Sequence, residues 1–235
     1  MTILCFVWAV LLNVWDITCY GAVATYYTGN RIFMFIELFM VTFMYLVLGM
    51  IHKRYNHIQI LVKNTSTTHF CCQVMTRKKF GDIGRHYFRS YRLVDRFNDL
   101  FGWIAFLIVA NSCLSILAYT TWSHEKKYGS FKGEKILMAI AQTTLILGYN
   151  TALVTTCDRI IKTKEKITIS CYLQQIETSD RHLAEELSKF ALTTERLTPR
   201  FLAGGLLEIN QNFFSGFLMS VASYCIICIQ FNVDK

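Results

Sequence analysis

Charged residues and proline are both scarce in this sequence of 235 residues. Only 17% of the residues are charged, and there is a single proline, Pro199. A soluble domain carries about 25% charged residues. Hydrophobic residues make up 53% of the sequence, which excludes a disordered or collagen-like chain. Because these residues are gathered in long blocks, the composition indicates a membrane protein.

The motifs of common enzymes are also missing. The sequence contains no glycine-rich phosphate loop, no HExxH metal motif and no GxSxG nucleophile elbow. Its six histidines are scattered, and none is paired with a second histidine at i,i+4 spacing. We therefore expect no enzyme activity, no metal site and no cofactor. The net charge of +8 is distributed in a pattern that favours a membrane topology over nucleic-acid binding.

Five hydrophobic runs approach the ~20 residues that a helix needs to cross ~30 Å of hydrocarbon. They cover residues 3–27, 32–51, 101–122, 136–157 and 213–231. A cleaved signal peptide is the alternative for the first run, although that run lacks a basic start. The sequence therefore predicts an all-α membrane protein with about five transmembrane helices, which form one domain over 1–235.

Lysine and arginine are concentrated in two of the connections between these runs. Residues 52–100 hold ten and 158–212 hold eight, against four in 123–135 and one in 28–31. Since these residues favour the cytoplasmic side, we expect both long connections and the N-terminus to be cytoplasmic and the C-terminus extracellular. A glycosylation sequon at 64–66 conflicts with this orientation, and the charge distribution carries more weight.

Two segments of the long connections have the spacing of amphipathic helices. In 84–100, which we expect to continue into the third span, the apolar stripe is Phe88, Tyr91 and Val94, with Arg92 and Asp95 opposite. In 180–197 the stripe is Leu183, Leu187 and Phe190, beside Arg181, Glu185 and Lys189 at i,i+4 spacing. Such helices lie on the membrane surface or in a cytoplasmic bundle. Residues 158–212 hold eight acidic and eight basic residues, which favours packing against protein.

Two acidic residues, Asp16 and Glu37, lie inside predicted spans. A charge in mid-membrane is costly and normally faces protein or water. The pair therefore belongs either to a proton or ligand site, or to helix packing as protonated or hydrogen-bonded groups. The same two interpretations apply to the intramembrane residues Asn13, Asn111, Gln142 and Asn150.

The last predicted span has a stripe of mostly small or polar residues at steps of three and four. Its members are Gly216, Ser220, Ser223, Ile227 and Gln230. Such a stripe either allows close helix packing or faces water in a pore.

The end of this span resembles the C-terminal signature of the insect gustatory receptors, which reads Thr-Tyr, five hydrophobic residues and Gln-Phe. Residues 223–231, S-Y-C-I-I-C-I-Q-F, have the same spacing, with serine in place of threonine. The segments 97–111 and 199–214 are also similar to this family. The predicted orientation agrees with the family and is opposite to that of the G-protein-coupled receptors.

The resemblance implies a subunit of a tetrameric, tastant-gated, non-selective cation channel in the cell membrane of a sensory neuron, either homomeric or heteromeric. In such channels the last helix of each subunit lines the pore, and cytoplasmic helices form an anchoring bundle. Tastants bind among the outer halves of the earlier helices. By position, Gln230 and Phe231 would form the constriction near the outer mouth, Ile227 the next ring inward, and Tyr224 would pack behind the pore helix.

The family has seven spans, and counting back from the signature makes these five runs the last five. We therefore expect the first two spans to be missing from this sequence. Sugar-responsive members have an acidic residue where Cys225 stands, which favours a bitter or other aversive ligand. The alternatives are a non-conducting remnant or accessory subunit, a G-protein-linked receptor, and a transporter that uses Asp16 and Glu37.

Overall fold

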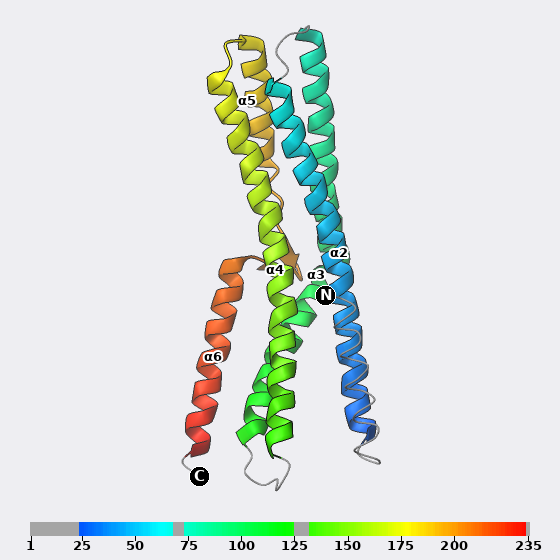
Figure 1. Ribbon diagram of the computed structural model, residues 1–235, viewed down its shortest axis with the longest axis vertical. Helices are drawn as coiled ribbons and strands as arrows, with labels where there is room; N and C mark the ends of the chain where they lie inside the picture. The colour runs from blue at the N-terminus through cyan, green and yellow to red at the C-terminus, as the bar shows by residue number, and fades with distance from the viewer. Residues whose placement is uncertain (1–23, 68–72, 125–131, 234–235) are drawn as a thin grey trace. The chain divides into compact units, whose positions relative to one another are not determined.

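The computed structural model describes residues 24–67, 73–124 and 132–233, and these residues are almost entirely helical, as predicted (Figure 1). The elements are α2 (Ala24–Thr67), α3 (Gln73–His124), α4 (Lys132–Glu177), α5 (Arg181–Arg196), β1 (Leu202–Ala203), β2 (Leu207–Glu208) and α6 (Gln211–Val233). The chain divides into two compact units, Met1–Val47 and Leu48–Lys235. The described part of the first unit is the beginning of α2.

Helices continue well beyond the predicted spans. Spans 32–51 and 101–122 overlap the two described segments that are long and apolar enough to cross a membrane, Phe35–Asn64 and Lys79–Leu114. Spans 136–157 and 213–231 fall within α4 and α6, whereas most of 3–27 lies outside the described residues. The long connections are largely helical because α2, α3 and α4 extend into them.

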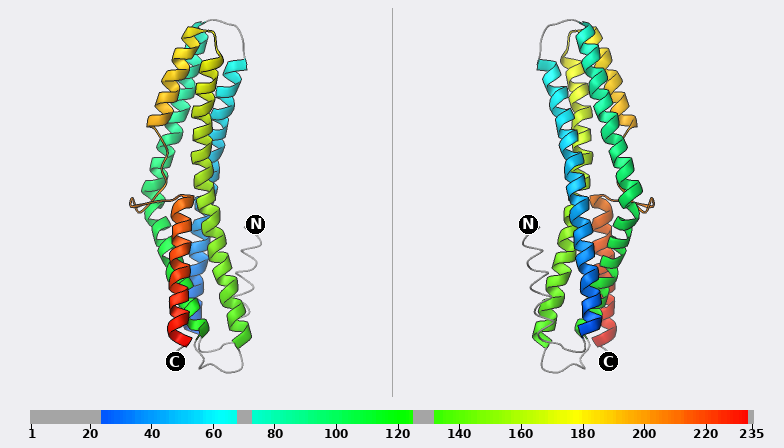
Figure 2. Two further views of the ribbon diagram at one scale, coloured as in Figure 1. Left: turned by 90° about the vertical axis from the view of Figure 1, so that its left-hand side faces the viewer. Right: turned by 90° about the vertical axis from the view of Figure 1, so that its right-hand side faces the viewer.

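The core of the second unit is a bundle of four helical segments, which Figures 1 and 2 show side by side. Buried residues recur at steps of three and four, which keeps them on one face of each helix. They are Leu48, Ile51, Tyr55, Ile58 and Val62 of α2; Phe80, Ile83, Tyr87, Val94 and Phe97 of α3; Ile160, Ile167 and Cys171 of α4; and Leu187, Phe190 and Ala191 of α5. Tyr87 forms edge-to-face contacts with Tyr55 and Phe190, at centroid distances of 5.8 and 5.9 Å.

Helix α5 confirms the amphipathic helix predicted in 180–197. The Asp180 side chain caps its first turn by accepting a hydrogen bond of 2.9 Å from the backbone N–H of His182. Arg181 forms the predicted pair with Glu185, at 3.5 Å. Leu187 and Phe190 are buried and Leu183 is half-buried, so the predicted stripe faces the bundle.

Helix α3 confirms that 84–100 is helical and that Val94 of the predicted stripe is buried, but the first turn of the buried face differs from the prediction. Tyr87 and Ser90 are buried, whereas Phe88 is 41% exposed and lies under the Arg92 guanidinium, 4.6 Å from the ring centroid. The placement of Phe88 in the apolar stripe was therefore wrong. Tyr87 can occupy the core because its hydroxyl donates a hydrogen bond of 2.7 Å to the carbonyl of Leu197.

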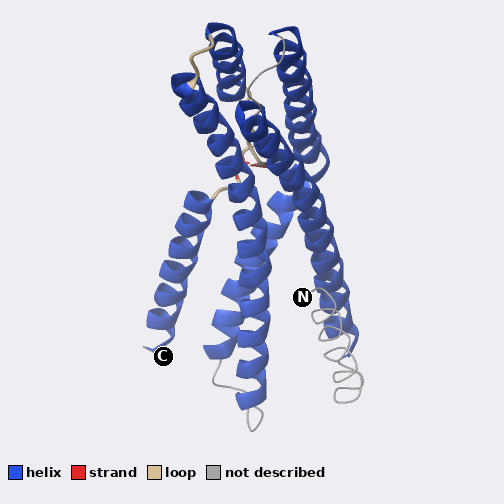
Figure 3. Cartoon of the chain, turned by 45° about the horizontal axis from the view of Figure 1, so that its top comes forward, coloured by secondary structure: helices blue, strands red, loops and turns tan. Residues whose placement is uncertain are grey.

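A short antiparallel hairpin, which the sequence analysis did not predict, connects α5 to α6 (Figure 3). Ala203 pairs with Leu207 across it. The turn contains Gly204 and Gly205 at φ 60° and 70°, in the left-handed region that glycine adopts without strain.

Candidate functional site

Helix α6 packs on the rest of its unit through one face near its middle. Val221 of α6 is buried together with Ile116 of α3 and Ile146 of α4, and Phe217 packs against this cluster. These contacts fix α6 beside α3 and α4 and leave much of its surface uncovered.

The small and polar stripe predicted on α6 lies on the uncovered surface. Gly216, Ser220, Ser223, Ile227 and Gln230 are all exposed, with Ile227 at 44%. The Ser220 hydroxyl donates to the carbonyl of Gly216 at 3.0 Å, and the Ser223 hydroxyl bonds back to its own helix in the same way. Because both hydroxyls are already hydrogen-bonded within the helix, the stripe can face either an apolar surface or water.

The other residues predicted for the site are spread over the chain. Tyr224 is 61% exposed, so most of its side chain is uncovered by the described part of one subunit. Glu37 is half-buried on the part of α2 that belongs to the first unit. Asp16 and the side chain of Phe231 lie outside the described residues. The proton or ligand site at Asp16 and Glu37, like the constriction at Phe231, stays a prediction.

A polar contact inside the predicted spans joins α3 to α4. The buried Asn150 side chain donates a hydrogen bond of 2.9 Å to the Ser112 hydroxyl and one of 3.0 Å to the carbonyl of Ile146. Ser112 in turn donates to the carbonyl of Ile108. Of the two interpretations given for Asn150, its contacts support helix packing.

The hairpin that precedes α6 is held on α3 by three hydrogen bonds. Asn98 donates from Nδ2 to the carbonyl of Arg200 at 2.7 Å and accepts at Oδ1 from the N–H of Leu202 at 3.0 Å. The N–H of Gly204 donates to the carbonyl of Gly102 at 2.7 Å. A hairpin backbone and a helix backbone therefore lie in direct contact.

This close approach requires glycine on the helix. A Cβ atom at Gly102 would lie 2.9 Å from the carbonyl oxygen of Leu202, closer than a carbon atom is tolerated. Next to it Phe97 and Phe201 pack edge-to-face at 5.8 Å. The segment 97–111 resembles the family in sequence, but its residues alone do not predict this contact. A Gly-Gly turn ahead of a predicted helix was the signal that could have indicated it.

The hairpin also sets where α6 begins. The N–H of Ile209 donates to the carbonyl of Phe201 at 2.8 Å, and the Asn210 side chain accepts from the N–H of Phe213 at 2.8 Å, in the manner of a helix N-cap. Hydrogen bonds thus connect α3, the hairpin and the first turn of α6 without interruption.

The family model that describes the 7tm chemosensory receptors matches residues 1–234. The chain belongs to this family. A relative in Drosophila melanogaster, "Putative gustatory receptor 98b", is 42% identical over 52 residues, which are 22% of this chain and 13% of the relative. The alignment thus spans about an eighth of that relative's length. The two findings confirm the resemblance to the insect gustatory receptors, a family of receptors and not of enzymes.

The surface of this chemosensory receptor fits a membrane location. Large apolar side chains are exposed on α2, α3 and α4, among them Phe39 at 63%, Leu107 at 62% and Leu137 at 69%. In water a surface of this kind promotes aggregation, whereas lipid solvates it. Among the described residues no group of three His, Cys, Asp or Glu side chains lies close enough to hold a metal ion.

Proposed function

We propose that this receptor is a subunit of a tastant-gated cation channel in the cell membrane, in which α6 lines a pore at the axis of a homo- or heterotetramer. The observation that supports it is the exposed stripe of small and polar residues on α6, away from the face that packs on α3 and α4. Around a fourfold axis these stripes would face one another and form a polar lining.

Within this pore Gln230 and Ile227 have different roles. The amide of Gln230 replaces part of the hydration shell of a cation, and a ring of Ile227 side chains resists wetting when the pore is closed. A tastant opens the channel only by binding the open state more tightly than the closed state. The hydrogen-bonded connection from α3 through the hairpin to α6 is the route by which we expect α6 to respond.

Current recordings test the pore assignment. Cells that express the receptor, with partner subunits where needed, are compared with cells that express Gln230→Ala during application of a tastant panel. We expect a cation current whose amplitude or permeability ratio changes several-fold in Gln230→Ala. Gln211→Ala is the matched control, because Gln211 is exposed on the same helix but lies off the stripe.

Equal effects of the two substitutions would reject the pore assignment. Surface-expressed receptor without current, alone or with partners, would instead favour a non-conducting accessory subunit.

The ligand class is proposed from Cys225, which stands where sugar-responsive members have an acidic residue. We expect bitter or other aversive compounds to evoke the current and sugars to evoke none. Activation by a sugar, in cells that express this receptor without a sugar-responsive partner, would overturn this assignment.

A further inference from the structure

A cleft of about 400 Å³ lies between α2 and α3, and every charged residue that lines it is basic. All its lining residues lie on α2 and α3 within the second unit, so the cleft is separate from the stripe on α6. Its polar lining residues are Lys53, Arg54 and His57 of α2, and His86, Arg89 and Ser90 of α3.

An adjoining cleft extends the same basic surface. It has a volume of about 440 Å³, shares His57 and His86 with the first, and adds Lys79. Its only acidic lining residue is Asp82, which forms an ion pair with Arg85 one turn further along α3. The one carboxylate near the cleft is thus already matched by a cation.

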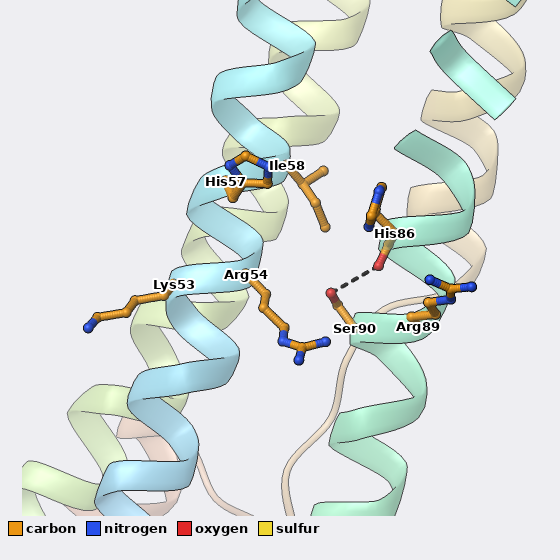
Figure 4. Close-up of a pocket in the computed structure, with 7 residues that line it drawn as sticks. All are labelled: Lys53, Arg54, His57, Ile58, His86, Arg89 and Ser90. Carbon is orange, nitrogen blue, oxygen red and sulfur yellow. Dashed lines mark hydrogen bonds between the residues drawn. The ribbon is translucent and has the colours of Figure 1, made fainter. Parts of the chain in front are cut away.

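Figure 4 shows how the basic side chains are arranged. The Arg54 guanidinium extends from α2 into the space between the helices, toward Ser90 and His86. Lys53 and Arg89 stand at the two edges and point outward in this view. The Ser90 hydroxyl donates to the carbonyl of His86 at 3.0 Å, within its own helix.

The charge of the cleft is not compensated within the described part of the chain. There, none of the three long cations Lys53, Arg54 and Arg89 forms an ion pair with a carboxylate. Other lysines of the same unit are paired, for example Lys162 with Asp158 at 2.9 Å and Lys189 with Glu186 at 3.0 Å. Basic side chains that line one cleft from two helices without a carboxylate partner favour an anion, and arginine forks match phosphate oxygens in a bidentate manner.

On its α2 side the cleft is close to the predicted membrane boundary. Lys53 is two residues beyond the predicted span 32–51, and His57 is six residues beyond it. At 1.5 Å per helical residue both lie within about 10 Å of the end of that span, at the depth of lipid headgroups. Basic pockets beside transmembrane helices on the cytoplasmic side are suited to phosphoinositide headgroups.

We propose that this cleft binds an anion with several phosphate groups, which bridges the cations of α2 and α3. A phosphoinositide headgroup and a soluble inositol phosphate share this chemistry. The bound anion would hold α2 and α3 together at the level of the cleft. This binding does not require that α6 line a pore.

Binding measurements with the purified full chain in nanodiscs test the proposal. Fluorescent inositol trisphosphate is the soluble probe, and nanodiscs of phosphatidylcholine with or without phosphatidylinositol 4,5-bisphosphate supply the lipid. The cleft variant is Arg54→Gln with Arg89→Gln. The matched control is Arg92→Gln with Arg96→Gln, which removes the same charge from exposed positions on α3 outside the cleft.

We expect the wild type to bind the soluble probe, and the cleft variant to lose at least tenfold in affinity while the control stays within about twofold. If the phosphoinositide in nanodiscs displaces the soluble probe, the site is assigned to the lipid. If the probe is not displaced, the site is assigned to a soluble inositol phosphate. Absence of binding by the wild type, or equal losses in cleft variant and control, overturns the proposal. Thermal unfolding of each variant separates loss of binding from loss of fold. The variants Arg54→Lys and Arg89→Lys keep the charge and should retain partial affinity.

Discussion

At the contact between α3 and the hairpin, one absent methyl group determines how closely two backbones approach. Gly102→Ala would put a Cβ atom 2.9 Å from the carbonyl of Leu202, and neither backbone can move without losing the hydrogen bond between Gly204 and Gly102. We expect this substitution to destabilise the protein by about 1–3 kcal/mol. Thermal unfolding of the detergent-solubilised receptor measures the change.

The control for this prediction is Gly84→Ala, on the same helix. No atom lies within 4 Å of a Cβ at Gly84, and alanine in a helix interior is more stable than glycine by about 0.5–1 kcal/mol. The two substitutions should therefore shift the unfolding temperature in opposite directions. A loss of stability in both would mean that the close approach at Gly102 is not the cause.

Two buried tyrosines in the bundle should respond oppositely to loss of their hydroxyl groups. The Tyr87 hydroxyl donates to the carbonyl of Leu197, so Tyr87→Phe should destabilise by about 1 kcal/mol. The Tyr55 hydroxyl is buried without a hydrogen-bond partner among the described residues, so Tyr55→Phe should leave the stability unchanged or raise it. Chemical unfolding of both variants measures the two effects, and a larger loss in Tyr55→Phe would contradict the assigned contacts.

Lys164 makes the stability of the bundle depend on pH. Its ammonium group is buried and donates to the Thr198 hydroxyl at 3.0 Å. Burial lowers the pKa of Lys164, and the nearby carboxylates of Glu165 and Glu195 only partly oppose this shift. The unfolded chain then binds more protons than the folded one at pH values between the two pKa values. The free energy of unfolding therefore decreases as the pH falls from above the unfolded pKa of Lys164 to below its lowered folded pKa.

We therefore expect Lys164→Met to raise the unfolding temperature at pH 7, and this gain to shrink at about pH 10, near the ordinary lysine pKa. Lys166→Met is the control, because Lys166 is exposed on the same helix. A gain of the same size at both pH values would show that packing, and not charge burial, explains the effect.

At the scale of elements, hydrophobic periodicity predicted where helices form better than which face they bury. The stripe of α5 was predicted correctly because its apolar residues alternate with charges. On α3 the prediction placed Phe88 in the stripe and left out Tyr87, because periodicity cannot detect the distant carbonyl of Leu197 that lets the Tyr87 hydroxyl be buried. The hairpin was missed because strands of two residues carry almost no pattern.

The same limit applies to the candidate site. The exposed stripe on α6 follows from sequence spacing alone, because it repeats within one helix. The contact of Asn98 with the hairpin joins residues about a hundred positions apart, and a single sequence contains no signal of that distance.

Asn98 is the residue by which α3 holds the hairpin, and through it the start of α6. Asn98→Ala removes two hydrogen bonds and should destabilise the protein by about 1–3 kcal/mol. Asn98→Asp keeps the acceptor for the N–H of Leu202 but loses the donor to Arg200, so we expect a smaller loss. The exposed neighbour Asp99 provides the control Asp99→Ala.

If the hairpin also transmits gating, Asn98→Ala should shift the tastant concentration for half-maximal current, whereas Asp99→Ala should not. Unchanged stability in Asn98→Ala would show that the apolar contacts and the hydrogen bond from Gly204 to Gly102 are enough to hold the hairpin on α3.

At the scale of the whole molecule, two kinds of surface alternate along the chain. The segments of α2, α3 and α4 inside the predicted spans expose large apolar side chains, while their extensions and α5 expose charges around a bundle core. A single helix can carry both surfaces because it passes from lipid to water without interruption. The family supports the membrane setting, and the orientation within it rests on the lysine and arginine distribution.

That orientation predicts which parts of the receptor are accessible outside the cell. An epitope tag at the C-terminus should be labelled by antibody in intact cells. A tag inserted after Ser179, in the short exposed connection between α4 and α5, should be labelled only after permeabilisation. The sequon at Asn64 is an internal reporter, because an intracellular asparagine is not glycosylated and treatment with a glycosidase should leave the mobility of the protein unchanged. The reverse labelling pattern, with a glycan on Asn64, would place the bundle outside the cell, as a G-protein-linked topology requires. The cytoplasmic leaflet could then not supply a phosphoinositide to the basic cleft.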